Sequence, residues 1–207
     1  MDADVQECSG IFSKFPKVND SCKKIRELLN EEGIKTVIDN MAEKVVAWAK
    51  SSQDSVILMG MASRGVPIAK NVAEILSSKH NLNVAVGTID NSYYRDDFHY
   101  RKRTNNPSIK IIEMPAEVEG KTVILIDDVL YTGRSVRAAL QAILDLGRPA
   151  AVKLCVIVDR GCRELPIAPD YVGISIETKH NQEVKVCVSP YDKETAVWLV
   201  EIEGEAA

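Results

Sequence analysis

The feature that most constrains this 207-residue chain is an apolar run that ends in two adjacent carboxylates. Residues 123–126 read VILI, a length and a degree of β-branching typical of a strand buried on both faces of a parallel sheet. Asp127 and Asp128 follow at the carboxyl end of this strand. Because side chains alternate along an extended chain, the two acids point to opposite sides, and at most one faces a given ligand directly.

A turn of small and polar residues, TGRS at 132–135, follows the acids. An apolar stripe with helical spacing comes next: Val136, Leu140, Ile143 and Leu144. This stripe predicts a helix that ends by Gly147 and places the amides of the turn at its N-terminus, an anion-binding geometry. Acids that accept hydrogen bonds from vicinal hydroxyls, beside a monophosphate cradle, suit a phosphorylated ribose. A solvated strand end before an ordinary helix is the simpler alternative.

The chain contains two predicted strand–helix–strand units. The first has strands at 56–59 and 83–89 around a helix with Ala69, Val72, Ala73 and Leu76 on one face. The second has strands at 123–126 and 151–158 around a helix at 135–146. An amphipathic helix from Ile34 precedes both units. Two such units imply an α/β fold with a parallel sheet, helices on both faces and ligands at the carboxyl ends of the strands.

A second turn of the same kind lies at 60–65, where GMASRG follows the first predicted strand and precedes a helix. Its amides and its arginine would form a second anion site. Alone, the pattern also fits an ordinary glycine turn with a surface arginine, but its position one unit upstream of the acidic strand favours the anion site.

Composition limits the class of protein. With 45% hydrophobic and 27% charged residues, the chain can form one sizeable core. No apolar run reaches the roughly 18 residues that would span a bilayer, and the N-terminus MDADVQECSG is acidic where a secretory signal is basic, so we expect a cytoplasmic protein without a membrane partner. Five cysteines without CxxC spacing favour neither a disulfide framework nor a zinc site. The net charge of −4 counts mildly against general nucleic-acid binding.

Several motifs, taken together, resemble one family. They are SRGVPIAKNVAE at 63–74, YYRDDF at 93–98, VLYTGRSVRAAL at 129–140, LGRPA at 146–150, DRGCRELPI at 159–167 and DYVG at 170–173. In this order they resemble the PyrR family of type I phosphoribosyltransferases, over roughly residues 34–201. The resemblance implies the type I phosphoribosyltransferase fold, a central parallel sheet flanked by helices with a small hood. It also implies a uracil phosphoribosyltransferase that makes UMP and pyrophosphate from uracil and 5-phosphoribosyl 1-pyrophosphate (PRPP).

The same resemblance assigns roles to both turns. Asp127 and Asp128 would be the catalytic acids, one of which faces the ribose. The residues that bind PRPP or ribose 5-phosphate would be Val129, Leu130, Tyr131, Thr132, Gly133, Arg134 and Ser135. The pyrophosphate loop would be Ala62, Ser63, Arg64 and Gly65. The base would be fixed near Val158 and Arg160.

Residues 92–120 show no helix or buried strand, and a loop of that length in a compact domain is usually functional or disordered. By resemblance it is a flexible lid that excludes water from an oxocarbenium-like centre. Arg95 and Arg103 are the lid residues that we expect to reach the pyrophosphate. The hood would span about 159–182, within a phosphoribosyltransferase domain at 31–207, and residues 1–30 would be an N-terminal extension of unknown role.

The implied reaction uses Mg²⁺, which would bridge pyrophosphate and ribose hydroxyls and reach Asp127 and Asp128 indirectly, because Mg²⁺ keeps several of its waters. The implied partners are PRPP, uracil or UMP, and further copies of the chain in a homodimer or a higher homo-oligomer.

The alternative function is an RNA-binding attenuator of pyrimidine biosynthesis genes that senses uridine nucleotides. The RNA-facing positions of the family hold Asp39, Glu43, Cys162 and Ala168 here, and only Arg163 keeps its basic character. Two carboxylates on one helix face would repel an RNA backbone, which argues against specific RNA binding. A phosphoribosyltransferase for a purine or orotate is also possible from the sequence, because few contacts set the choice of base. The intact acids disfavour a catalytically silent binding module.

Overall fold

The computed structural model describes residues 23–52, 55–90, 110–114, 116–179 and 181–202. Its centre is a six-stranded sheet with the order β4-β3-β2-β5-β6-β7. Five neighbouring strands are parallel: β3 (Ala85–Asp90), β2 (Val56–Met61), β5 (Thr122–Leu130), β6 (Ala151–Asp159) and β7 (Tyr171–Ser175). β4 (Lys110–Glu113) pairs antiparallel with β3 at the edge. The predicted parallel α/β sheet is confirmed.

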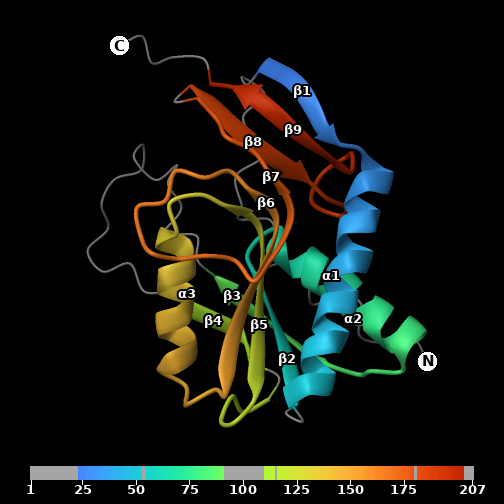
Figure 1. The fold of residues 1–207 in the computed structure, drawn as a ribbon, viewed down its shortest axis with the longest axis vertical. Helices are drawn as coiled ribbons and strands as arrows, with labels where there is room; N and C mark the ends of the chain where they lie inside the picture. The colour runs from blue at the N-terminus through green and yellow to red at the C-terminus, as the bar shows by residue number, and fades with distance from the viewer. Residues whose placement is uncertain (1–22, 53–54, 91–109, 115, 180, 203–207) are drawn as a thin grey trace, which may run out of the picture.

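Helices cover both faces of this sheet (Figure 1). α1 (Glu31–Ser52) and α2 (Gly65–His80) lie on one face, and α3 (Arg134–Leu144) lies on the other. Along β5, Ile124 and Ile126 belong to the core under α1 and α2, whereas Val123 and Leu125 belong to the core under α3. All four are fully buried. The uninterrupted VILI run is therefore apolar because each face of β5 packs against a helix.

A small antiparallel sheet with the order β1-β9-β8 lies over the carboxyl ends of the parallel strands (Figure 1). It consists of β1 (Lys23–Leu29), β9 (Ala196–Glu201) and β8 (Gln182–Cys187). Val186 and Val197 are buried in the same core as α1, which joins the small sheet to the rest of the domain. Most of the predicted N-terminal extension, residues 1–22, lies outside the described residues, and its described part forms the edge strand β1.

Some predicted elements differ from the observed ones. β5 continues through the acids to Leu130, and the edge strand β4 lies inside the stretch where no helix or buried strand was expected. β7, which lies within the predicted hood range, extends the main sheet. Leu144, expected on the apolar stripe of α3, is 54% exposed, because it is the last residue of the helix and Ile143 takes the buried position. In the described part of the chain, no helix has the length and apolar character needed to cross a membrane.

Candidate functional site

The first part of the site is the turn between β5 and α3. Gly133 is the N-cap of α3 with φ of 89°, a left-handed conformation that glycine adopts without a Cβ penalty. The Arg134 amide donates a hydrogen bond to Thr132 Oγ1 at 3.3 Å, and the Thr132 carbonyl accepts from the amides of Glu164 and Leu165 at 3.0 and 3.2 Å. These bonds fix the turn from both sides and leave its amides at the N-terminus of α3, as the sequence predicts.

The second part is the turn between β2 and α2, which begins at Gly65. A Cβ on Gly65 would lie 2.4 Å from the carbonyl oxygen of Ile126, so only glycine allows the backbone of this turn to rest against β5. The Ala62 amide donates to the Ile89 carbonyl at 2.8 Å and ties the turn to β3, and the Ala62–Ser63 peptide is cis. The two predicted anion-binding turns therefore meet at the end of β5, beside Asp127.

The acids lie between the turns. Asp127 is 8% exposed and Asp128 is half-buried. The charge of Asp128 acts on Arg64, the N-cap residue of α2. The strict alternation of β5 breaks at the acids, because Val129 packs with Ile126 against the core under α1 and α2, whereas Leu130 belongs to the core under α3. The opposite orientation of the two acids therefore stays a prediction. Each carboxylate accepts a hydrogen bond from the next amide: Asp127 Oδ1 from Asp128 and Asp128 Oδ1 from Val129, both at 2.9 Å. Each acid is thus tied to the backbone that follows it.

Arg64 is tied to the small sheet. Its Nε and one terminal nitrogen donate to the two carboxylate oxygens of Asp192 at 2.9 Å each, and both side chains are largely buried. Burial lowers the pKa of Arg64, but the hydrogen bond that it donates to Asp192 and the negative charges of Asp128 and Asp192 outweigh this effect, so that the pKa is raised overall. The arginine of the predicted pyrophosphate turn therefore stays charged.

Two further arginines hold Tyr131, which precedes the turn before α3. The Arg160 guanidinium stacks on the Tyr131 ring at 3.9 Å from its centroid and donates to the Gln182 carbonyl at 2.8 Å. Arg163 donates to the carbonyls of Tyr131, Gly161 and Ile167 at 2.7, 3.0 and 3.1 Å and pairs with Asp159 at 2.6 Å. The segment after β6 is thereby attached to the chain just ahead of the turn before α3.

Not every predicted residue comes to the site in the same way. The Val158 side chain is fully buried in the core under α1, so only its backbone remains for a contact with a base. Arg160 is 8% exposed and already bonded within the fold, and a contact between it and a base stays a prediction. Arg95 and Arg103 lie outside the described residues. Sequence reasoning missed Asp192, which is 128 positions from Arg64 and belongs to no recognisable motif.

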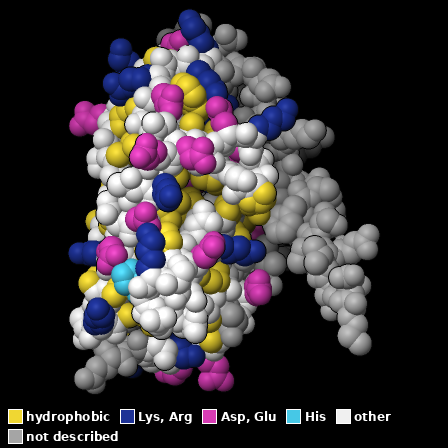
Figure 2. Space-filling model, turned by 90° about the vertical axis from the view of Figure 1, so that its right-hand side faces the viewer, with side chains coloured by type: hydrophobic (Ala, Val, Ile, Leu, Met, Phe, Trp, Pro, Cys, Tyr) yellow, Lys and Arg dark blue, Asp and Glu magenta, His cyan; other side chains and the backbone are white. Residues whose placement is uncertain are grey.

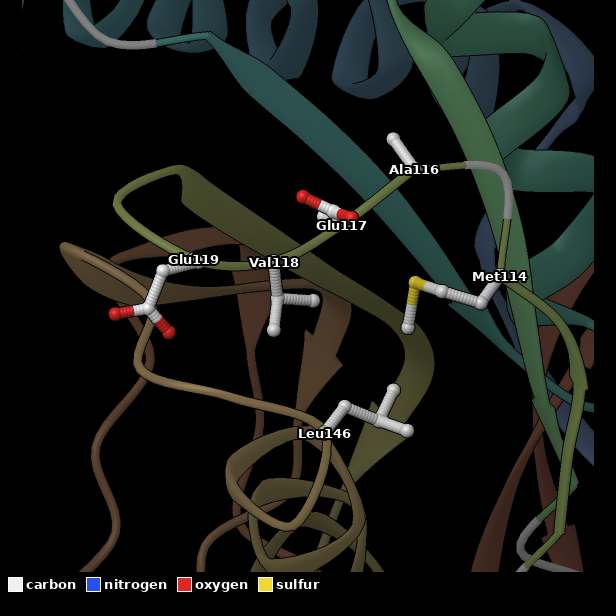
Figure 3. Close-up of a pocket in the computed structure, with 6 residues that line it drawn as sticks. All are labelled: Met114, Ala116, Glu117, Val118, Glu119 and Leu146. Atoms are coloured by element: carbon white, nitrogen blue, oxygen red, sulfur yellow. The ribbon is translucent and has the colours of Figure 1, made fainter.

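A hollow in the described part of the chain lies elsewhere (Figure 3). It has a volume of about 470 Å³ and is lined by Met114, Ala116, Glu117, Val118, Glu119 and Leu146. These residues come before β5 and after α3, at the end of the sheet opposite Asp127. Figure 3 shows the side chains of Met114 and Leu146 pointing toward one another. The described lining residues include two glutamates and no cation, so this hollow would repel a phosphate.

Comparisons with known proteins agree with this geometry. The model of the phosphoribosyl transferase domain matches residues 24–192. The bifunctional protein PyrR of Latilactobacillus sakei is 40% identical over 175 residues, 84% of this chain and 97% of that protein. PyrR of Alkaliphilus metalliredigens is 43% identical over 172 residues, 83% of this chain and 93% of its own. The hypoxanthine phosphoribosyltransferase of Trypanosoma cruzi shares the fold, with a TM-score of 0.66 at 18% identity, over 87% of this chain and 98% of that one.

Proposed function

This chain belongs to the PyrR family of type I phosphoribosyltransferases, and we propose that it transfers the phosphoribosyl group of PRPP to uracil, giving UMP and pyrophosphate. One observation carries this proposal: the backbone of Gly65 rests on the Ile126 carbonyl and thereby brings two anion-binding turns to one pair of acids. A donor with a phosphate at one end and a pyrophosphate at the other requires two such turns on either side of its ribose.

In the proposed reaction, the bond between C1 of the ribose and the pyrophosphate oxygen breaks with its electron pair going to the pyrophosphate. A bond from C1 to N1 of uracil forms, and N1 loses its proton to water or to the departing pyrophosphate. The turn at 132–135 holds the 5-phosphate with its amides, and the turn at 62–65 holds the departing pyrophosphate. Asp128, whose charge acts on Arg64, stabilises the positive charge that develops at C1. Asp127 keeps the strand end in place by accepting a hydrogen bond from the Asp128 amide.

The donor set at the end of β5 fits Mg²⁺. Asp127 and Asp128 offer carboxylate oxygens, the hard ligands that this ion prefers, and one or two carboxylates suffice because water and substrate oxygens complete its shell. When bound, Mg²⁺ would neutralise charge on the pyrophosphate. Asp128 is the residue that we expect to reach the ion, through water.

The regulatory alternative is less well supported. Asp39 lies 2.6 Å from Lys79, and Glu43 lies 3.1 Å from His80, so these acids form contacts between α1 and α2. Arg163 is engaged with backbone carbonyls and Asp159, as described above. Figure 2 shows Lys and Arg interspersed with Asp and Glu on the face seen from the side of α1 and α2. Such a mixed surface lacks the continuous positive charge that RNA binding needs.

The test is a transfer assay with purified full-length protein, PRPP and Mg²⁺, in which uracil, orotate, hypoxanthine, guanine, xanthine and adenine are supplied separately. We expect UMP from uracil and no product from the other bases. Product from a different base would replace uracil in the proposal. Absence of product with every base, from protein that binds PRPP in calorimetry, would favour a nucleotide sensor and the regulatory function.

A further inference from the structure

We propose that Asp192 is a positioning residue for the pyrophosphate turn and acts through Arg64. This inference rests on the proposed function, because it assumes that the turn at 62–65 binds the pyrophosphate of PRPP. Asp192 belongs to the turn between β8 and β9, so the small sheet would take part in binding the leaving group.

The pairing of Arg64 and Asp192 has the geometry of a structural clamp. Two parallel N–H to oxygen contacts of 2.9 Å join the planar guanidinium to the planar carboxylate, an arrangement that fixes both the position and the orientation of the arginine. The exposed fractions of the two side chains are 15% and 12%. An ion pair shielded to this extent constrains its partners far more than a solvated surface pair does.

Asp192 is itself held by its own backbone turn. Its Oδ2 accepts a hydrogen bond from the Val188 amide at 3.0 Å, and its amide donates to the Val188 carbonyl at 3.1 Å. Val188 is buried in the core under α1. The Asp192 carboxylate is therefore fixed relative to this core, and it fixes the position of the Arg64 guanidinium that binds it.

The clamp leaves Arg64 able to bind an anion. A guanidinium has five N–H donors, and the contacts with Asp192 use the Nε donor and one on a terminal nitrogen. The remaining donors lie on the part of the group that Asp192 does not cover. Asp192 thus orients the guanidinium without using all of its donors, and Asp128 supplies a second negative charge that acts on Arg64.

Kinetics of Asp192→Asn, Arg64→Lys and the double variant test this inference. Asparagine cannot pair with the guanidinium as a carboxylate does, so we expect kcat/KM for PRPP to fall about 10- to 100-fold, with KM for uracil changed less than about twofold. Asp192→Glu should restore most of the loss. Because Asp192 acts through Arg64, kcat/KM for PRPP in the double variant should be no lower than in the more impaired of the two single variants. Additive losses would overturn the inference.

Binding measurements separate this inference from the transfer reaction. In calorimetry, Asp192→Asn should weaken the binding of Mg²⁺-pyrophosphate about 10-fold. The affinity for ribose 5-phosphate, which we expect to bind at the other turn, should change less than about twofold. A role in positioning would be contradicted if the affinities for both ligands fell equally, or if neither affinity changed. The comparison remains valid if the wild-type protein fails to make UMP, which would contradict only the proposed function.

Asp170 provides the matched control. It pairs with Lys153 at 2.8 Å and accepts the Leu154 amide at 2.9 Å, so it resembles Asp192 in its partners but lies away from both turns. Asp170→Asn should leave pyrophosphate binding unchanged. A loss equal to that of Asp192→Asn would show that any such aspartate matters for stability alone, and would overturn the inference.

Discussion

The two turns that we propose to bind anions have similar sequences and different supports. Both place a small residue and an arginine between a buried strand and a helix. In the turn before α2, the arginine is largely buried and joined to Asp192 of a distant segment. In the turn before α3, Arg134 pairs with Glu164, and both side chains are about half exposed. Backbone hydrogen bonds from the segment after β6 hold this turn in place.

The difference shows that a charged side chain in such a turn does not have one fixed structural role. An exposed pair contributes little, so the turn before α3 depends on the left-handed Gly133 and on the bonds to Thr132 and Tyr131. A shielded pair holds the turn before α2. Pyrophosphate binding should therefore respond to the small sheet, whereas binding of the 5-phosphate should respond to the segment after β6.

The largest effect should come from the acid between the turns. Asp128→Asn keeps the shape and removes the charge that stabilises C1, so we expect the transfer rate to fall at least ~10²-fold, the scale for one preorganised electrostatic contact. Steady-state kinetics at saturating PRPP and uracil measure the rate, and thermal unfolding confirms that the variant folds. Near-normal turnover in a folded variant would rule out the ribose assignment and leave the turns without a shared centre.

Separation of the two turns should come next. Gly65→Ala places a methyl group 2.4 Å from the Ile126 carbonyl, so the turn must move away from β5. We expect kcat/KM for PRPP to fall about 10- to 100-fold and stability to fall by about 1–3 kcal/mol. In the control Gly33→Ala, the nearest atoms belong to the side chains of Leu29 and Asn30, which can adjust. Equal kinetics for the two variants would contradict the proposed contact.

The support of the turn before α3 gives a third, smaller effect. Arg163→Ala removes donors to four backbone carbonyls and to Asp159, which should cost about 1–3 kcal/mol of unfolding free energy. We expect ribose 5-phosphate binding to weaken about 10-fold and pyrophosphate binding to stay within about twofold. This is the reverse of the pattern for Asp192→Asn. If both ligands weakened together, the two turns would not be independently supported.

The smallest effect tests the exposed pair. Glu164→Gln removes the charge of the side chain and keeps the hydrogen bond from the backbone amide of residue 164 to the Thr132 carbonyl. We therefore expect the unfolding free energy to change by at most about 0.5 kcal/mol and the transfer rate to change less than about twofold. Chemical denaturation and the transfer assay measure both quantities. A loss as large as that of Arg163→Ala would show that the side-chain pair, rather than the backbone, holds this turn.

Local patterns predicted much of the fold. The VILI run and the stripe at Val136 and Ile143 gave a buried strand and an amphipathic helix, because burial on both faces or on one face leaves a periodic trace. The same reasoning misplaced Leu144, since a stripe does not reveal where the helix stops. β4 was missed because a four-residue edge strand carries too little periodicity.

The site was less predictable than the fold. The strand–turn–helix pattern and the family resemblance predicted both turns and both acids. Parallel strands that end at one edge of the sheet also predicted that the turns lie close together. The partners of the arginines did not follow. Asp192 and Arg64, or Arg163 and Tyr131, are brought together by tertiary packing across long stretches of sequence, and a charged residue in a loop gives no sign of which distant charge it meets.

The register of β1 on β9 has a mechanical consequence. Lys23 lies opposite Glu201, so the outer ends of the first and last described strands meet at one end of their ladder. A pulling force applied at these two ends would load the ladder one pair at a time and unzip it, instead of shearing all its bonds together. The small sheet should open at low force before the parallel sheet, and Arg64 would then lose Asp192 early in forced unfolding.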